Sequence, residues 1–134
     1  MALKFGKIEQ TLFFKASPGQ VYDALLDPEK HSEFTGSRAT TSDRVGAEFE
    51  AWDGYISGKN IELVKNKKIV QDWETTEWPE GYPRSRLVFT LVPKRGGTEL
   101  RMVQTRVPAS EVEKYSEGWH ESYWEPLSAY LEKA

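Results

Sequence analysis

Histidines and acidic residues are the side chains in this sequence that could bind a metal or transfer protons. The two histidines, His31 and His120, fall in different predicted helices, and the chain contains no cysteine. A metal site needs three or four converging ligands, and no clustered ligand motif occurs in the sequence. We therefore expect no metal and no other cofactor, and we interpret His120 as a surface histidine.

Closely spaced carboxylates, such as Asp72 with Glu74 and Glu48 with Glu50, occur two residues apart in strand-like stretches. Residues with this spacing share one face of a strand. On a half-solvated sheet that face is the wet one, whereas acid–base catalysis needs a buried carboxyl group with a shifted pKa. Spacing also suggests no Ser-His-acid triad, so we name no catalytic residue and favour a non-enzymatic protein.

One glycine-containing stretch, Gly54–Lys59, is similar to a phosphate-binding loop. It lacks one residue between the glycines, and Asn60 stands where the loop requires serine or threonine. The stretch also lies within a strand pattern, so we reject a phosphate site. Gly58 is instead predicted to mark a bulge or a close approach of the sheet to a covering helix.

Aromatic residues make up 13% of the chain and include five tryptophans, which gives the best sign of a binding site. Several of them are expected between the predicted sheet and the last helix. The candidate cavity residues are Trp73, Trp78, Phe89, Gln104, Trp119, Tyr123 and Leu127. If packing is complete these residues are core; if the sheet curls widely they line an apolar small-molecule pocket.

The stretch Glu113–Lys133 is predicted to be a long helix that covers the sheet. Its apolar residues recur at helical spacing and form one stripe: Tyr115, Trp119, Tyr123, Leu127, Tyr130 and Leu131. Pro126 removes a backbone donor in the middle of this helix, so we expect a kink there. Ser110 and Glu113 are predicted to form a capping box at its start.

Upstream of that helix, strand and helix signals alternate. Leu3–Lys15 reads as a strand, and Ser17-Pro18-Gly19-Gln20 predicts a capped helix start. Asp27-Pro28 should separate two short helices, and Gly36 should end the second. About six strands joined by short turns follow, as between Arg95 and Thr98, and consecutive strands of this kind pair antiparallel.

These elements predict an α+β helix-grip fold. A curved antiparallel sheet wraps around the long C-terminal helix, and residues 1–134 form a single domain. The net charge of −3 and the dispersed lysines argue against nucleic-acid binding. No stretch resembles a signal peptide or a membrane span, so we expect a cytoplasmic protein.

Four stretches of the sequence resemble the C-terminal domain of the activator of heat-shock protein 90 ATPase, a branch of the Bet v 1-like, START-related superfamily. They are Trp52–Gly58, Leu63–Val70 with Trp73, Trp78–Gly81, and Gly118-Trp119 followed by Tyr123–Glu125. The likeness extends from about Ile8 to Tyr130. It implies a helix-grip fold, in agreement with the element order.

The resemblance leaves three functions open. The first and favoured one is a non-enzymatic domain that binds an apolar or aromatic small molecule or a lipid in the cavity. The second is a co-chaperone-like protein that binds heat-shock protein 90 or another protein through its surface. The third is a cyclase or hydrolase acting on a polyketide-like substrate. The protein is expected to be a monomer or a dimer, and by fold analogy a ligand should enter where Pro79–Pro83 and Phe34–Ser37 approach one end of the helix.

Overall fold

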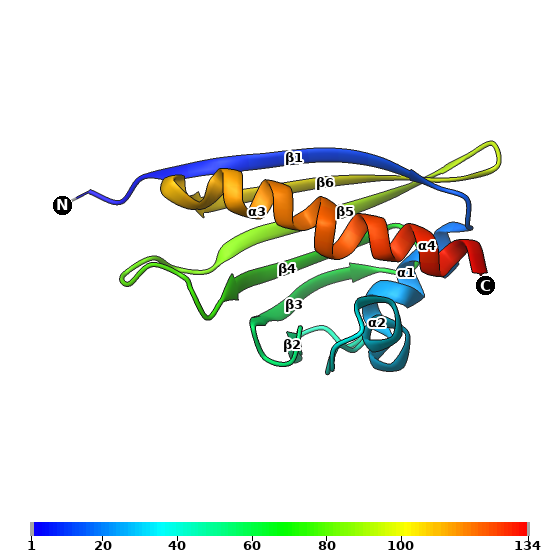
Figure 1. Cartoon of the computed structure of the whole chain (residues 1–134), viewed down its shortest axis with the longest axis horizontal. Helices are drawn as coiled ribbons and strands as arrows, with labels where there is room; N and C mark the ends of the chain where they lie inside the picture. Colours follow the sequence, from blue (N-terminus) through cyan, green and yellow to red (C-terminus); the bar gives the residue numbers. More distant parts are fainter. Residues whose placement is uncertain (1, 134) are drawn as a thin grey trace.

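Strands and helices follow one another in nearly the expected order in the computed structural model, which describes residues 2–133 (Figure 1). The strands are β1 (Phe5–Phe14), β2 (Glu48–Ala51), β3 (Ile56–Val64), β4 (Lys68–Thr75), β5 (Ser85–Lys94) and β6 (Gly97–Pro108). The helices are α1 (Pro18–Leu26), α2 (Pro28–Thr35), a 3-10 turn (Ala109–Glu111), α3 (Val112–Trp119), a π turn (His120–Trp124) and α4 (Glu125–Lys133).

Five strands, rather than about six, follow the short helices among the described residues. The stretch from Ser37 to Ala47 was expected to contain strand structure, but it crosses the surface as a loop. Side chains supply part of its backbone bonding, because the amide of Asn60 donates to the carbonyls of Ser42 and Arg44 at 2.9 and 3.0 Å. A segment bonded in this way does not need a neighbouring strand.

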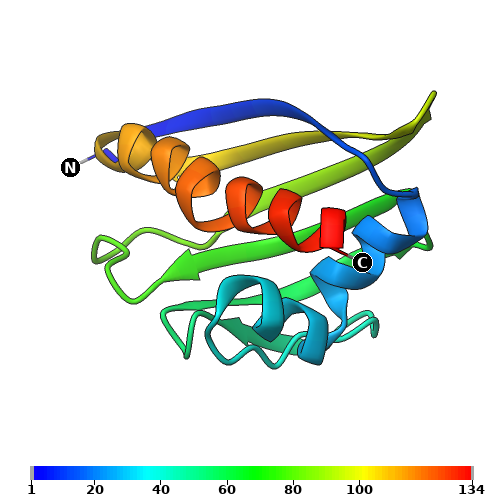
Figure 2. The same ribbon diagram turned by 45° about the vertical axis from the view of Figure 1, so that its right-hand side comes forward.

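The six strands form one antiparallel sheet in the order β1-β6-β5-β4-β3-β2. The sheet is curved, and α3, the π turn and α4 run as one rod across its concave face, with α1 and α2 packed at one end (Figure 2). Alternate residues of each strand face the rod, as the buried positions of β5 show. The helix-grip prediction is therefore confirmed.

Local signals fixed the two short helices as expected. Ser17 and Gln20 form a complete capping box, with Pro18 at the first helical position. The carboxylate of Asp27 accepts hydrogen bonds from the first amides of α2, and Gly36 ends that helix with a φ of 78°. The predicted capping box of Ser110 is wrong, because Ser110 lies inside the 3-10 turn and α3 begins after Glu111 without a side-chain cap.

At Pro126, where a kink is expected, the terminal helix contains a widened turn. Pro126 has no backbone N–H to donate, and the turn just before it widens into a π turn, in which the amide of Glu125 donates to the carbonyl of His120. The wider turn places Tyr123 and Trp124 side by side on the buried face. Trp124, absent from the predicted stripe, is 3% exposed and belongs to the core.

Gly58 is neither a bulge nor a contact with the helix, so that prediction is wrong. A Cβ on Gly58 would lie 2.0 Å from the carbonyl oxygen of Asp72 and within 2.8 Å of the Phe49 ring. The glycine therefore makes room for Phe49 against β4, while the irregularity in β3 falls between Asn60 and Glu62. Among residues 2–133, no helix combines the length and the apolar character that crossing a bilayer requires.

Candidate functional site

A groove of about 230 Å³ opens between the terminal helix rod and the β2–β3 hairpin. Aromatic rings form most of its walls, and Ile56 of β3 and three small or polar helix residues form the rest. Its lining residues are Trp52, Tyr55, Ile56, Trp73, Lys114, Tyr115, Gly118, Trp119, Ser122 and Tyr123. We take this groove as the candidate functional site.

The seven residues predicted from the sequence divide between this groove and the core. Trp73, Trp119 and Tyr123 line the groove. The other four do not line it: Phe89 and Leu127 are buried in the core, Gln104 is buried beneath Trp119, and Trp78 is partly buried against Trp73. A role in ligand binding stays a prediction for the three groove residues.

The core itself is nearly full. A second void, between the sheet and the helix rod beside Phe89, measures about 20 Å³, which is the space of about one water molecule. Rings pack around it, with Trp119 stacked on Trp124 at a centroid distance of 5.3 Å and Phe89 edge-on to Trp119 at 5.8 Å. The sheet therefore closes on the helix and leaves no room there for a larger guest.

The expected entrance is wrong. Residues Pro79–Pro83 and Phe34–Ser37 do not line the groove and lie toward different ends of the helix rod. Phe34 packs against Tyr123 and Tyr130, whereas Tyr82 packs against Phe5, at the far end of the sheet. The groove instead lies along the side of the helix rod, beside the β2–β3 turn.

Polar tips of the helix aromatics are bonded within the protein. The indole N–H of Trp119 donates to Gln104 at 2.9 Å, and Gln104 donates to the hydroxyl of Ser85 at 3.0 Å. On the other side, the N–H of Trp124 donates to Gln10 at 2.7 Å, and the amide of Gln10 donates to the carbonyl of Ser116. These hydrogen bonds anchor the helix rod to β1 and β6, so the tips are structural rather than free for a ligand.

Tyr123 is bonded to the buried histidine of α2. The Nδ1 atom of His31 lies 2.9 Å from the carbonyl of Leu25, which can only accept, so Nδ1 carries the proton. Its Nε2 atom, 3.1 Å from the Tyr123 hydroxyl, is then the acceptor. Burial lowers the pKa of His31 to about 4, against a smaller opposing effect of the Leu25 carbonyl, and burial raises the pKa of Tyr123. His31 is therefore a neutral structural residue.

One end of the groove carries an ionic network. Tyr55 and Lys114 donate to the same carboxylate oxygen of Glu77, at 2.6 and 2.7 Å. The hydrogen bonds from Lys114 and then from Tyr55 lower the pKa of Glu77, and its bond to Glu77 raises the pKa of Lys114. Burial and then the bond to Glu77 raise the pKa of Tyr55. None of these groups is tuned toward neutral pH, as an acid–base catalyst would be.

Two groove residues, Trp52 and Gly118, are not among the cavity residues predicted from the sequence. Trp52 directly follows β2 with a φ of 53°, outside the strand region, and its side chain lines the groove. A non-glycine residue in this conformation is uncommon and cannot be inferred from alternation. Gly118, which the resemblance singled out only as part of a motif, forms an open part of the wall.

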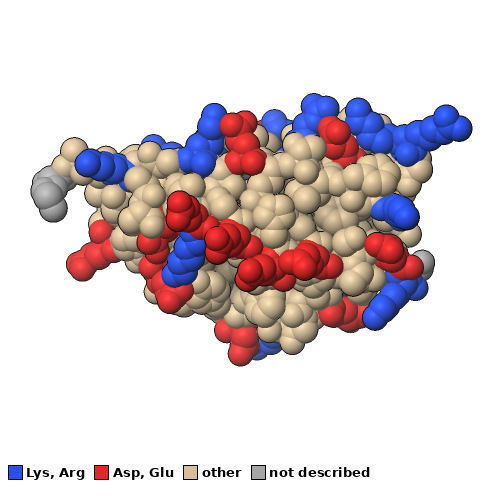
Figure 3. Space-filling view, turned by 45° about the horizontal axis from the view of Figure 1, so that its top comes forward, with Lys and Arg blue, Asp and Glu red and all other residues tan. Residues whose placement is uncertain are grey.

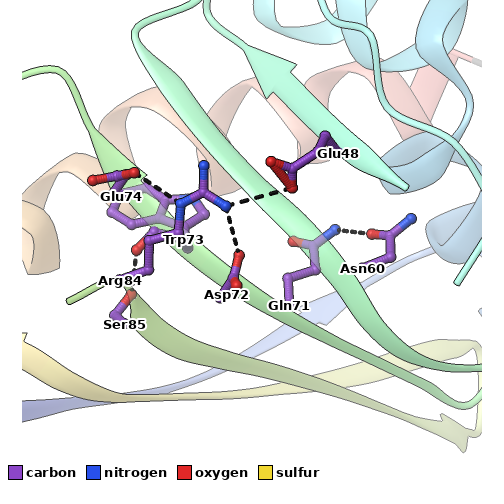
Figure 4. Close-up of polar contacts among 8 residues, drawn as sticks. All are labelled: Glu48, Asn60, Gln71, Asp72, Trp73, Glu74, Arg84 and Ser85. Atoms are coloured by element: carbon purple, nitrogen blue, oxygen red, sulfur yellow. Dashed lines mark hydrogen bonds and ion pairs between the residues drawn. The ribbon is translucent and has the colours of Figure 1, made fainter. Parts of the chain in front are cut away.

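The predicted wet-face carboxylates lie on the opposite face of the sheet from the groove. Arg84 pairs there with Glu74 at 2.8 Å, Asp72 at 3.2 Å and Glu48 at 3.5 Å (Figure 4). The same view shows the buried Gln71 bonded to Asn60. The carboxylates thus form a structural ion network, and the described residues contain no group of three or more side chains arranged to bind a metal.

Comparisons with known proteins agree with this architecture. A family model described as "Activator of Hsp90 ATPase homolog 1-like protein" matches residues 15–132. The human protein "Activator of 90 kDa heat shock protein ATPase homolog 1" is 36% identical over 114 residues, which cover 85% of this chain and 33% of the human one. The chain thus spans about a third of the length of the curated relatives it matches.

Solved structures support the same fold. A crystal structure of an HSP90 activator from Plasmodium falciparum superimposes with a TM-score of 0.86 at 25% identity, covering 94% of this chain and 96% of that one. The solution structure of the Aha1 dimer from Colwellia psychrerythraea gives a TM-score of 0.80 at 19% identity, covering 95% and 96%. The second likeness bears on the fold alone.

Proposed function

The chain belongs to the family of Activator of Hsp90 ATPase homolog 1-like proteins, and on that premise we propose that it is a non-enzymatic, co-chaperone-like domain that binds a 90-kilodalton heat-shock protein through its surface. The observation that carries the proposal is the closed interior. Because the void between sheet and helix holds about 20 Å³, a larger guest does not fit there, which supports recognition through the outside of the molecule. The names of the human relative and of the Plasmodium structure support this choice of partner.

Isothermal titration of the whole chain against the host's 90-kilodalton heat-shock protein tests the proposal. We expect saturable binding. Binding rather than stimulated ATP hydrolysis is the readout, because the chain matches only about a third of the length of its human relative. A folded chain that releases no heat and is not retained by the immobilised chaperone would refute the proposal. Bovine serum albumin, immobilised at the same density, is the control for adhesion.

A small apolar or aromatic molecule in the groove is the second candidate, and the aromatic walls favour it. The volume of about 230 Å³ is below the roughly 300–1,000 Å³ of typical ligand pockets, which favours a single-ring compound over a lipid. Titration with indole, followed by the NMR signals of the tryptophan N–H groups, tests it. Unchanged Trp52 and Trp119 signals at millimolar indole would exclude this ligand class.

The third function, a cyclase or hydrolase, has less support from the site. The ionisable side chains at the groove, Glu77 and Lys114, are bonded to each other, and the pKa of Glu77 is lowered rather than raised. A cytoplasmic location and a monomeric or dimeric state are parts of the same proposal. Cell fractionation and sedimentation at micromolar concentration test them directly.

A further inference from the structure

We propose that the groove receives one arginine side chain from a basic segment of the protein partner, with the chain of that segment running beside the acidic side of the helix rod. The inference takes the kind of partner from the proposed function, whereas the arginine chemistry comes from the groove itself. Three observations carry it: aromatic walls, an unfilled glycine and a row of carboxylates.

Aromatic faces at the groove can hold a cation, as the Lys114 ammonium 5.3 Å from the centre of the Tyr115 ring shows. Trp73 lies edge-on to Tyr115 at 5.4 Å and tilted against Trp119 at 5.5 Å, and all three line the groove. An arginine guanidinium is planar and weakly hydrated, and it stacks on aromatic faces. Arginine, tryptophan and tyrosine are also the residues that most often fill pockets at the centre of interfaces. A groove of about 230 Å³ is sized for one such side chain.

Trp52 lines the groove, but its indole donor is not exposed there. Its indole Nε1 is buried, and no acceptor within residues 2–133 bonds to it. Its backbone also has a φ of 53°, in the left-handed region that non-glycine residues rarely adopt. The left-handed backbone belongs to the β2–β3 turn, in which Asp53 and Gly54 also have positive φ, and the position of Trp52 in the groove wall makes its indole N–H signal a reporter of binding there.

Gly118 keeps the groove open. It lies in α3, where a glycine destabilises a helix by about 1 kcal/mol relative to alanine. Its φ is ordinary, and a Cβ placed on it would meet no atom within 4 Å. Packing within the chain therefore does not require glycine here, whereas a guest in the groove does.

Carboxylates border the groove along the helix. Glu113, Glu117, Glu121 and Glu125 are all exposed and recur every fourth residue, and the first three directly precede the groove residues Lys114, Gly118 and Ser122. A row of acidic side chains crosses the face shown in Figure 3. Lys114, the cation of the groove itself, is held by Glu77 at 2.7 Å and Glu111 at 3.8 Å. The border is therefore suited to a basic segment.

The test fills the groove without touching the core. Gly118→Leu places a side chain in open space, and Ala129→Leu is the matched control, since it adds the same side chain at an exposed position of α4. We expect Gly118→Leu to weaken binding to the 90-kilodalton heat-shock protein about tenfold or more, as blocked pockets at interface centres do, and Ala129→Leu to leave it unchanged. Circular dichroism and urea titration verify that both variants fold.

A second measurement uses the peptide acetyl-GKGRGKG-amide and its variants with lysine or glutamate in place of the arginine. The arginine peptide should shift the indole N–H signal of Trp52 saturably, the lysine peptide more weakly and the glutamate peptide not at all. These shifts should disappear in Gly118→Leu and weaken in the double variant Glu117→Gln, Glu121→Gln. Glu132→Gln, which removes an exposed carboxylate away from the groove, is the control for a general loss of negative charge.

The outcomes separate the two proposals. Full chaperone binding by Gly118→Leu, with no Trp52 shift by any peptide, overturns the arginine site and leaves the chaperone proposal standing. A specific arginine shift without chaperone binding supports the site and refutes the choice of partner. A shift with indole but with none of the peptides overturns the arginine site in favour of a small molecule.

Discussion

Acidification should destabilise this protein through the single buried histidine of α2. His31 is 5% exposed and held in its neutral form between the Leu25 carbonyl and the Tyr123 hydroxyl. Its pKa is about 4 in the folded protein, against an ordinary value of 6.5, because burial disfavours the charged ring. Between these two pH values the unfolded chain binds a proton on His31 that the folded chain does not.

The size of the effect follows from this difference in pKa. One pKa unit corresponds to about 1.4 kcal/mol, so His31 alone should lower the free energy of unfolding by about 3 kcal/mol as the pH falls from about 6.5 to about 4. Above this window the contribution is constant, because the ring is neutral in both states. Below it the ring is charged in both states, and the contribution is constant again.

Urea denaturation at half-unit pH steps measures this loss, and NMR titration of the imidazole C–H signals measures the pKa directly. Carboxylates also titrate near pH 4, so the wild-type curve is compared with that of His31→Gln, which should lose most of the decline between pH 6.5 and 4. His120→Gln, at the exposed second histidine, is the control and identifies the remaining signal. A His31 midpoint near 6.5, or an unchanged decline in His31→Gln, would refute the reasoning.

Three further substitutions probe the packing. Trp119→Ala should lower the free energy of unfolding by about 3–5 kcal/mol in urea denaturation, because the ring is 3% exposed; a loss below about 1 kcal/mol would contradict its place in the core. Gly58→Ala should cost about 3 kcal/mol in the same assay, because the added Cβ overlaps the neighbouring strand and the Phe49 ring, and a neutral effect would disprove that overlap. Arg84→Met should cost about 1 kcal/mol at low salt by leaving three carboxylates unpaired, and the loss should shrink in 1 M NaCl; a loss independent of salt would point to packing instead.

Signals that act within a few residues predicted most of the fold. The capping box of Ser17, the cap of Asp27 and the stop at Gly36 depend on neighbouring backbone groups, and each was found as expected. The long apolar stripe of the last helix and the apolar faces of the strands then predicted the helix-grip fold, because packing the helix on the sheet buries both surfaces. The box at Ser110 failed because a 3-10 turn, invisible in the residue pattern, precedes the helix.

Features that depend on distant atoms could not be read in the same way. The tightness of Gly58 comes from β4 and Phe49, and the left-handed backbone of Trp52 comes from the geometry of the hairpin turn. The predicted cavity residues include both groove and core residues for the same reason. The residue pattern shows which side of a strand or helix a ring lies on, but not how closely its neighbours pack against it. The polar tips of four helix aromatics, Tyr115, Trp119, Tyr123 and Trp124, have their partners on β4, β6, α2 and β1.

The widened turn before Pro126 makes the length of the terminal helix as important as its composition. The one residue that it adds lets Tyr115 and Trp119 upstream, and Leu127 and Leu131 downstream, all reach the same wall of strands. A regular α-helix over the same residues, without the widened turn, would rotate everything after it by about 100°. Leu127 and Leu131 would then turn away from the sheet although every side chain remained in the sequence, whereas deleting one residue of the widened turn would restore a regular α-helix without that rotation.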